Sequence, residues 1–173
     1  MRAALLAQRM AAFRARVDDV RQGLVFGSDV FPPSIALPGG HDYSRWERAT
    51  DFLTGGSSAG GVVGWATGAT NAAAEWAQAL TEQAPEVGEE DAVELALRLL
   101  SQDDMEDVGR QIHALREGTV PLAALYGREV ARLVAVTSGR VPLYPPISAG
   151  GNPDLVRRLA ASVRAHISRS PMG

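Results

Sequence analysis

The sequence predicts an all-α protein, with six or seven helices in one bundle-like domain and two apolar, proline-rich extended segments. Apolar residues recur at helical spacing over most of the 173 residues,. Capping residues, glycines and prolines separate these periodic stretches at intervals typical of helices. The chain lacks the series of buried hydrophobic strands that an α/β sheet requires. At this length we expect a single domain, residues 1–173, that buries about two-thirds of its unfolded surface.

Two residue types are missing, and their absence excludes several kinds of chemistry. The chain has no cysteine, which rules out disulfides, zinc–thiolate sites and cysteine nucleophiles,. All 17 basic residues are arginine, so no mechanism that depends on a lysine is available,. The three histidines, His41, His113 and His166, are far apart and belong to no metal-binding pattern,. We therefore expect neither a metal site nor a cofactor.

Residues 1–24 are predicted to form an N-terminal amphipathic helix. Their large apolar positions are spaced alternately by four and three residues, which gives a narrow apolar stripe. Such a stripe is compatible with two arrangements, contact with the protein's own core or docking onto a neighbouring chain. The residues of the stripe are Leu6, Met10, Phe13, Val17, Val20 and Leu24.

Residues 25–42 and 140–151 are predicted to be extended arms. Several prolines prevent a helix in the first arm,, although a short pair of strands would fit there. Both arms are rich in apolar residues, including Phe31 and Tyr144. An apolar loop must lie against something, either its own domain or a partner.

A helix is predicted between Ser44 and Leu53. Ser44 and Glu47 have the spacing of a capping box, in which the serine accepts a backbone amide and the glutamate reaches back,. Gly55 and Gly56 would end this helix. The chain would then enter the following turn from a helix, whereas a catalytic serine elbow requires an entering strand.

The stretch Gly56-Ser57-Ser58-Ala59-Gly60 supports two interpretations that exclude each other. In the first, it is a G-x-S-x-G turn that presents Ser58 as a nucleophile. In the second, which we favour, Ser58 caps a helix that extends to about Gln83. If the glycines interrupt this helix, residues 54–68 form a loop. In the helical interpretation, one side-chain-free face for close backbone approach carries Gly60, Gly64, Gly68 and Ala72,.

The same stretch carries two local resemblances. Gly56 to Gly60 resembles the nucleophile elbow of α/β-hydrolase esterases, and Gly55 to Ser58 resembles the serine loop of the amidase-signature family. The amidase-signature mechanism requires a lysine, which this chain lacks. The esterase resemblance covers only a few residues and implies a small serine hydrolase, which we retain as an alternative. Its catalytic residues would be Ser58, then Asp91 or Asp103, then His113 or His166.

Further helices are predicted in the second half of the chain. Acidic residues in first turns, glycines after last turns and a proline at a first helical position mark their boundaries. Arg157 and Arg164 lie seven residues apart on the outward face of the last one. The helices are expected to begin near Glu89, Asp103, Pro121 and Asn152.

Charge is distributed unevenly along the chain. The net charge is +3 over residues 1–21, −2 over 22–74, −10 over 75–107 and +6 over 108–173. Basic ends and an acidic middle can neutralise each other within one chain or attract a second copy. The total charge of −3 and the absence of lysine argue against general nucleic-acid binding,.

These features favour a non-enzymatic structural or assembly subunit of a larger protein complex. Its partners would be other protein subunits, in a homo-oligomer or a hetero-assembly, and a phage virion or head–tail component is one such setting. A helical chaperone or regulator that binds one partner protein is the other alternative. Gln8 and Arg9 interrupt any signal-peptide core and no segment is apolar enough to span a bilayer, so a cytoplasmic or particle-bound protein is expected,. The expected contact residues are Leu6, Met10, Phe13, Val17, Gly60, Gly64, Gly68, Phe31, Tyr144, Arg157 and Arg164.

Overall fold

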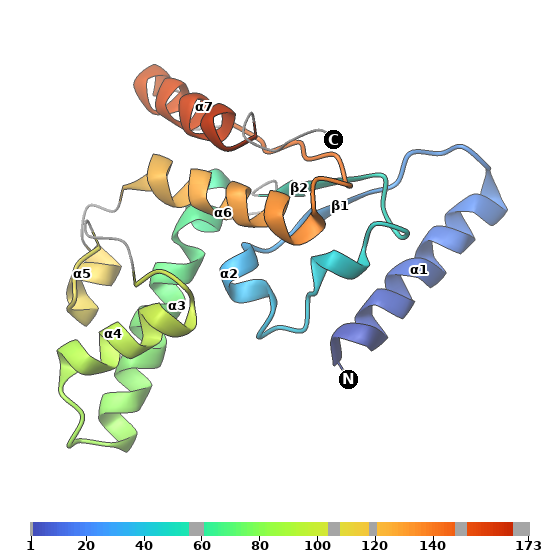
Figure 1. Cartoon of the computed structure of the whole chain (residues 1–173). Coiled ribbons are helices and arrows are strands. Elements are labelled where there is room, and N and C mark those ends of the chain that lie inside the picture. Colours follow the sequence, from blue (N-terminus) through green and yellow to red (C-terminus); the bar gives the residue numbers. More distant parts are fainter. Residues whose placement is uncertain (1, 56–60, 104–107, 118–120, 148–151, 168–173) are drawn as a thin grey trace.

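Seven α-helices and two short strands make up the described part of the chain in the computed structural model, which covers residues 2–55, 61–103, 108–117, 121–147 and 152–167. Figure 1 shows helices α3 to α7 gathered at one end, the strands in the middle and α1 at the other end. In chain order the elements are α1 (Arg2–Val20), β1 (Gly27–Val30), α2 (Pro33–Ala36), a 3₁₀ helix (Tyr43–Arg45), β2 (Phe52–Gly55), α3 (Gly61–Gln83), α4 (Glu89–Leu99), α5 (Ile112–Glu117), α6 (Leu122–Thr137) and α7 (Pro153–Ile167).

The predicted helical character is confirmed, but the fold also contains a small parallel sheet that the all-α expectation omits. β1 and β2 pair in parallel, with Gly27 opposite Phe52 and Val30 opposite Gly55. Each strand has only four residues. A segment that short shows no readable alternation of apolar and polar positions, so its strand conformation follows from pairing in the folded chain.

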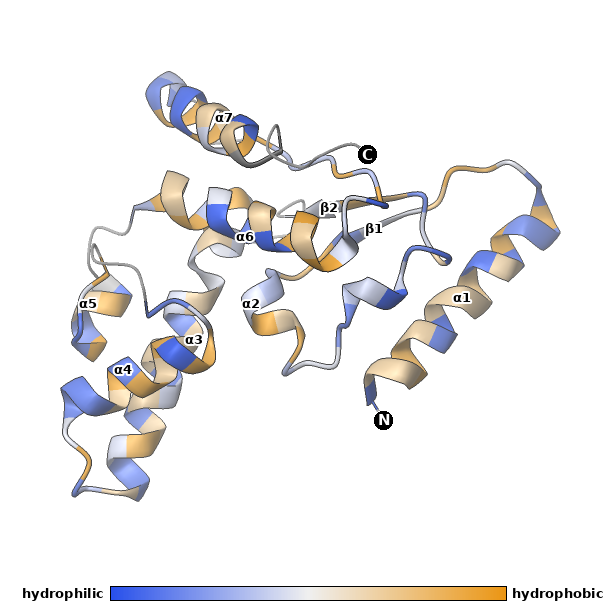
Figure 2. Cartoon of the chain, viewed as in Figure 1, coloured by the Kyte–Doolittle hydropathy of each residue, from blue (hydrophilic) through white to orange (hydrophobic). Residues whose placement is uncertain are grey.

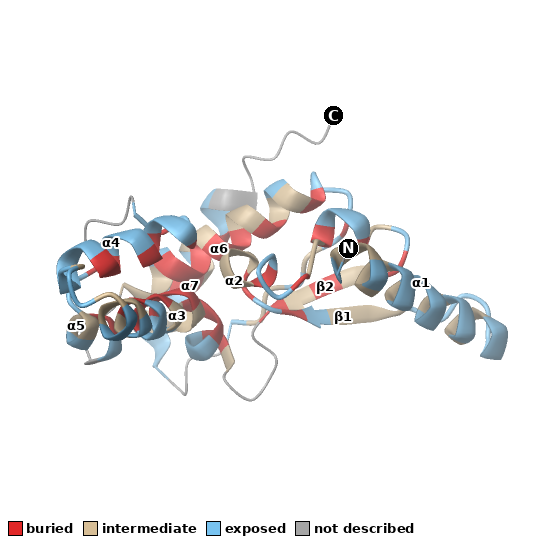
Figure 3. Cartoon of the chain, turned by 90° about the horizontal axis from the view of Figure 1, so that it is seen from below, coloured by how far each residue is buried: buried red, intermediate tan, exposed pale blue. Residues whose placement is uncertain are grey.

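Helix α3 is the centre of the helical part. It packs against α4, α5 and α6, and α6 in turn packs against α7. Its buried face consists mainly of alanines, and Ala69, Ala73 and Ala77 have no exposed surface. Because alanine side chains are small, they let the neighbouring helices approach closely without loss of helix propensity. Figure 3 shows the buried residues concentrated on these helices and on the strands.

The glycine face predicted on this helix does not make the expected contact. A Cβ added at Gly64 would meet nothing within 4 Å, and one at Gly68 would meet side-chain atoms of Ile35 and Pro32 at 3.3 Å. No neighbouring backbone lies against either glycine within that range. The close approach occurs on the alanine face instead, and Gly60 lies outside the described residues.

The helix predicted between Ser44 and Leu53 is wrong. The chain forms one turn of 3₁₀ helix and then β2. Asp42, and not Ser44, caps this turn, because its carboxylate accepts the Ser44 amide at 3.3 Å and the Ser44 hydroxyl as well. Tyr43 and Trp46 are both buried and their rings meet edge to face at 4.9 Å. Burial of these two rings decides the local conformation over the capping pattern.

The first proline-rich segment is part of the fold. It contains β1 and also α2, a four-residue helix that begins at Pro33, so the expectation that the prolines prevent any helix here is wrong. Proline is tolerated at the first helical position because its missing N–H would have no partner there. Val30 and Ala36 are buried in the core. The short strand pair considered for this segment does not form within it, since β1 finds its partner 25 residues later in β2, as Ser28 opposite Leu53 illustrates.

The second proline-rich segment also packs on its own chain. The Leu53 amide donates to the Pro142 carbonyl and the Tyr144 amide donates to the Leu53 carbonyl, both at 2.9 Å. Leu143 thereby forms a parallel bridge to Leu53 on the outer side of β2. The chain after Leu143 is fixed to α6, because the hydroxyl of the buried Tyr126 donates to the Pro146 carbonyl at 2.7 Å.

Most other helix boundaries agree with the sequence. α7 begins as expected, because Asn152 Oδ1 accepts the amides of Asp154 and Leu155 at 3.1 and 3.2 Å,. α6 ends before Ser138, which has a left-handed φ of 52°,. The helix expected to begin near Asp103 is shorter than predicted, since α5 begins only at Ile112.

Candidate functional site

Helix α1 lies at the edge of the molecule and none of its residues is buried. Figure 3 shows it in exposed and intermediate colours along its whole length. Leu6 and Met10, two residues of the predicted stripe, are half-buried and pack against the core. Phe13 and Val20, from the same stripe, are 61% and 85% exposed. The predicted stripe is therefore divided between the body of the protein and the solvent.

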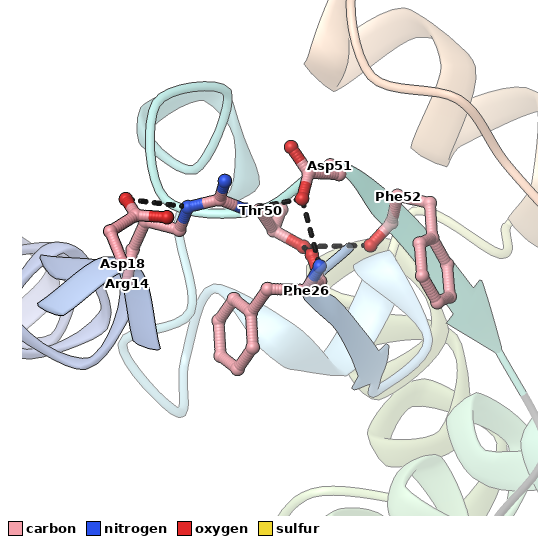
Figure 4. Close-up of polar contacts among 6 residues, drawn as sticks. All are labelled: Arg14, Asp18, Phe26, Thr50, Asp51 and Phe52. Carbon is pink, nitrogen blue, oxygen red and sulfur yellow. Dashed lines mark hydrogen bonds and ion pairs between the residues drawn. The ribbon is translucent and has the colours of Figure 1, made fainter. Parts of the chain in front are cut away.

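A polar network fastens α1 to the start of β2, and Figure 4 shows its members. The Arg14 guanidinium contacts the carboxylates of Asp18, at 3.1 Å, and of Asp51. Asp51 also accepts the Phe26 amide at 2.8 Å, while its own amide donates to the Phe26 carbonyl at 2.7 Å. The Thr50 hydroxyl donates to the carbonyl of the same phenylalanine at 3.1 Å. The ion pair between Arg14 and Asp51 thus joins α1 to the segment before β2. The hydrogen bonds between Asp51 and Phe26 join that segment to the one before β1.

The electrostatics of this network favour the ionised carboxylate. The hydrogen bond from the Phe26 amide, followed by the one from Arg14, lowers the pKa of Asp51 below its ordinary value,. Asp51 is 42% exposed. Solvent therefore screens the ion pair, and we expect it to orient α1 without contributing much to global stability.

The opposite side of α1 carries arginine and apolar side chains on one exposed face, which we call the outer face of α1. At 100° per residue its members fall within one sector roughly 100° wide, turned away from Arg14 and Val17, with Leu6 at its border beside Phe13. A shallow depression of about 260 Å³ lies on this face between Arg9, Ala12, Phe13 and Arg16. Figure 2 shows hydrophilic and hydrophobic residues alternating along the helix. The outer face consists of Leu5, Arg9, Ala12, Phe13, Arg16 and Val20.

A larger cleft, of about 830 Å³, opens between α2, the end of α4 and the end of α6. Its polar members include His41, Asp42 and Ser101. The His41 ring lies 5.2 Å from the Phe31 ring and 5.9 Å from the Trp46 ring, centroid to centroid, and burial lowers its pKa. The remaining wall is mostly apolar, formed by Pro33, Leu37, Pro38, Leu99, Ala135 and Val136.

A buried carboxylate stabilises the wall of this cleft. Glu129 on α6 has no exposed surface, and it accepts the Ser34 amide at 3.0 Å and the Gln102 amide nitrogen at 2.8 Å. Arg132, one turn later, forms an ion pair with it and also donates to the Ser101 carbonyl. All these partners donate to the carboxylate or fix the chain around it, so the group acts as a structural hub.

Sequence reasoning missed this hub, although a signal was present. Glu129 falls between Tyr126 and Val130 on the face of α6 that also carries Leu133 and is buried against the core. An acidic residue on an otherwise apolar helical face predicts a buried, paired carboxylate. Which residues would pair with it could not be predicted, because Ser34 and Gln102 lie on distant segments.

The residues of the serine hydrolase alternative are only partly described. Ser58 lies outside the described residues, and so does the side chain of His166 on α7. β2 ends at Gly55 and α3 begins at Gly61, so a strand does precede this stretch, contrary to our expectation. The absence of an entering strand therefore no longer counts against a nucleophile elbow.

His113 lies on α5 and is exposed. α5 is joined to the start of α4, because the Ile112 amide donates to the Glu89 carboxylate at 2.7 Å. It also contacts α3, where the Arg116 guanidinium pairs with the Glu75 carboxylate at 2.8 Å.

The other predicted contact residues are spread over the surface. Phe31 and Gly64 line one groove of about 300 Å³ beside β1. Tyr144 is 62% exposed and its ring meets that of Phe52 at 5.4 Å. Arg157 and Arg164 are exposed on α7, and Arg157 is paired with Asp154.

Val17 is half-buried and, like Leu6 and Met10, does not belong to the outer face of α1. Of the predicted contact residues, six are exposed and are spread over several elements: Phe13, Phe31, Gly64, Tyr144, Arg157 and Arg164.

Two further observations concern the described residues only. Within them, no three His, Asp or Glu side chains are placed to share a metal ion. No helix in this part of the chain combines the length and apolar character needed to cross a bilayer.

Comparison of the chain with protein-family models, with curated proteins and with solved structures gives no significant match.

Proposed function

We propose that this protein is a non-enzymatic assembly subunit that binds other protein subunits through the outer face of α1. The observation that carries the proposal is that a helix of 19 residues has no buried residue and yet exposes Leu5, Phe13 and Val20. Charged and alanine positions would suffice for a helix with no partner on this side. Large apolar residues on an unpartnered helical face are typical of a surface that becomes covered in a complex.

The energetics support this assignment. Burial of one large apolar side chain contributes about 1.5–3 kcal/mol. An isolated helix of this length is only marginally stable in water, and α1 gains little stability from contact with the core of the protein. A partner that covers the outer face would therefore stabilise the helix and bury the exposed phenylalanine at once. A virion or head–tail component of a phage is one proposed setting for such a subunit.

The test is the size of the protein in extracts of the cells that produce it. We expect the wild-type protein to sediment well above its own 18.3 kDa. Leu5→Asp with Phe13→Asp should return it to the monomer position, because aspartate on this face opposes burial. Gln8→Asp with Ala15→Asp, on another exposed side of the same helix, is the matched control and should leave the complex intact. A wild-type protein that sediments as a monomer overturns the proposal.

The composition of the complex separates the assembly subunit from the helical chaperone or regulator. Multiple copies in a defined particle support an assembly subunit. A complex with one copy of a single other protein supports the chaperone or regulator.

A serine hydrolase is the second candidate, and the strand that precedes residue 56 is the observation that favours it. The histidines that could supply its base are His113, which is exposed on α5, and His166, whose side chain lies outside the described residues. Labelling of the purified protein by a fluorophosphonate, lost in Ser58→Ala, would establish this candidate. Absence of labelling at a concentration that labels a known serine esterase would exclude it.

A further inference from the structure

We propose that the partner of the outer face of α1 is a second copy of this chain, which receives it on the exposed face of α4. This inference rests on the proposed function and names the partner and the surface. The receiving surface, here called the acidic face of α4, consists of Glu90, Asp91, Glu94, Leu95 and Leu99, all exposed. Arg98 is exposed among them, so the face carries three acidic residues and one basic residue.

The two faces are complementary in charge. Arg9 and Arg16 on α1 form no ion pair with any residue that the structure describes. Within the same ranges, Glu90, Asp91 and Glu94 have no ionic partner either. Exposed charges of opposite sign that remain unsatisfied on two faces of one chain favour contact between copies.

The two faces also match in apolar content. Leu95 and Leu99 are 47% and 65% exposed and stand one turn apart on α4. Leu99 also lines the cleft of about 830 Å³, together with Leu37, which is 65% exposed. The acidic face thus continues into an apolar cleft. This arrangement suits an amphipathic helix that places apolar side chains in a groove and arginines at its acidic border.

A contact within one molecule cannot satisfy these faces. Figures 1 and 3 view the molecule from two directions at right angles, and in both α1 and α4 lie at opposite ends. Each copy therefore offers a donor helix at one end and a receiving face at the other. Repetition of such a contact is head-to-tail and gives a ring or an open chain, unless two copies exchange their α1 helices reciprocally.

Sedimentation equilibrium of the purified full-length protein tests the inference. We expect the average mass to exceed that of the monomer at micromolar concentration in about 20 mM salt and to fall in about 500 mM salt, where exposed charges are screened. R9E/R16E on α1 and E90R/E94R on α4 should each weaken association about tenfold or more, because each opposes like charges across the contact. All four positions are exposed, so circular dichroism should remain unchanged.

The decisive measurement is a mixture of the two variants. R9E/R16E supplies an acidic α1 and E90R/E94R supplies a basic α4, while the unchanged faces also complement each other. An equimolar mixture should therefore regain the wild-type average mass. R157E/R164E on α7 is the matched control for R9E/R16E, because it makes the same change in net charge on another helix. This variant should associate like the wild type.

The inference is overturned if the purified wild-type protein stays monomeric in low salt, if R9E/R16E associates as the wild type does, or if the mixture does not associate. These outcomes leave the proposed function standing when the protein in cell extracts still sediments as a large complex that depends on Leu5 and Phe13. In that case the partner is a different protein.

Discussion

The ion pair between Glu129 and Arg132 is the least exposed charged contact among the described residues. The Glu129 side chain has no exposed surface and that of Arg132 is 23% exposed. A buried charge that loses its partner is strongly destabilising, whereas removal of both charges costs less. The pair therefore ties α2, the end of α4 and α6 together only while both members are present.

Arg132→Met should lower the free energy of unfolding by about 3 kcal/mol, because it leaves a carboxylate buried and unpaired. Glu129→Gln with Arg132→Met should recover part of this loss, since the amide side chain can still accept from Ser34. Urea unfolding of the three proteins measures both effects. Equal stability of the wild type and Arg132→Met would show that water reaches the carboxylate.

His41 should make stability depend on pH below neutrality. Burial lowers the pKa of His41 in the folded protein below its ordinary value of 6.5. The unfolded chain therefore binds more protons between these two values, and stability falls as pH decreases from about 6.5. His41→Phe keeps an aromatic ring beside Phe31 and Trp46 but cannot titrate. Thermal unfolding from pH 7 to pH 5 should decline less for this variant than for the wild type.

At the scale of elements, α3 shows how a helix can carry glycines without using them for contact. Gly64 stands in open space, while Gly68 has side-chain neighbours at a tight distance. Glycine inside a helix costs about 1 kcal/mol relative to alanine. The two positions therefore provide a matched pair of substitutions in one element.

Gly64→Ala should stabilise the protein by about 0.5–1 kcal/mol, because the new methyl group meets no atom and the unfolded chain loses freedom. Gly68→Ala should gain less or become destabilising, since its Cβ would lie 3.3 Å from Ile35 and Pro32. Chemical denaturation can rank the two. If Gly64→Ala is the more destabilising, another chain contacts this face.

Helix α1 depends on its anchor more than on burial. Arg14→Met removes the contacts to Asp18 and Asp51 but changes nothing in the core. We expect faster amide hydrogen exchange throughout α1, with the exchange of α3 and α6 unchanged, because local opening is separate from global unfolding. Arg14→Lys keeps the positive charge and should give an amide exchange rate in α1 between those of the wild type and Arg14→Met. Uniform acceleration across the whole chain would mean that α1 is part of the cooperative core.

For the whole molecule, the absence of buried residues in α1 predicts that the rest of the protein folds without this helix. Removal of residues 1–20 eliminates no buried residue. The remaining chain should therefore unfold cooperatively, with a melting temperature within about 4 °C of the wild type, since this shift corresponds to about 1 kcal/mol for a protein of this size. Circular dichroism melting measures it. A truncated chain without a cooperative transition would show that α1 is required for folding.

The sequence predicted the long helices because their signals are local. The first-turn acids of α4 and the cap of α7 at Asn152 act within one turn, so they can be identified without knowledge of the fold. The predicted split of the chain into basic ends and an acidic middle is likewise a property of the sequence alone. These features determine which helices exist and what charge each carries.

Only the tertiary structure decided what the short segments and the exposed faces do. Ser44 to Leu53 has the pattern of a helix, but burial of Tyr43 and Trp46 and pairing of β2 with a distant strand give a different conformation. Glu129 finds partners that lie far away along the chain. In the α1 stripe, Leu6 and Met10 pack against the core while Phe13 and Val20 are exposed, and this division depends on which part of α1 contacts the rest of the protein. Contacts between distant segments cannot be read from local periodicity, and these contacts determine the sheet, the cleft and the exposed outer face of α1.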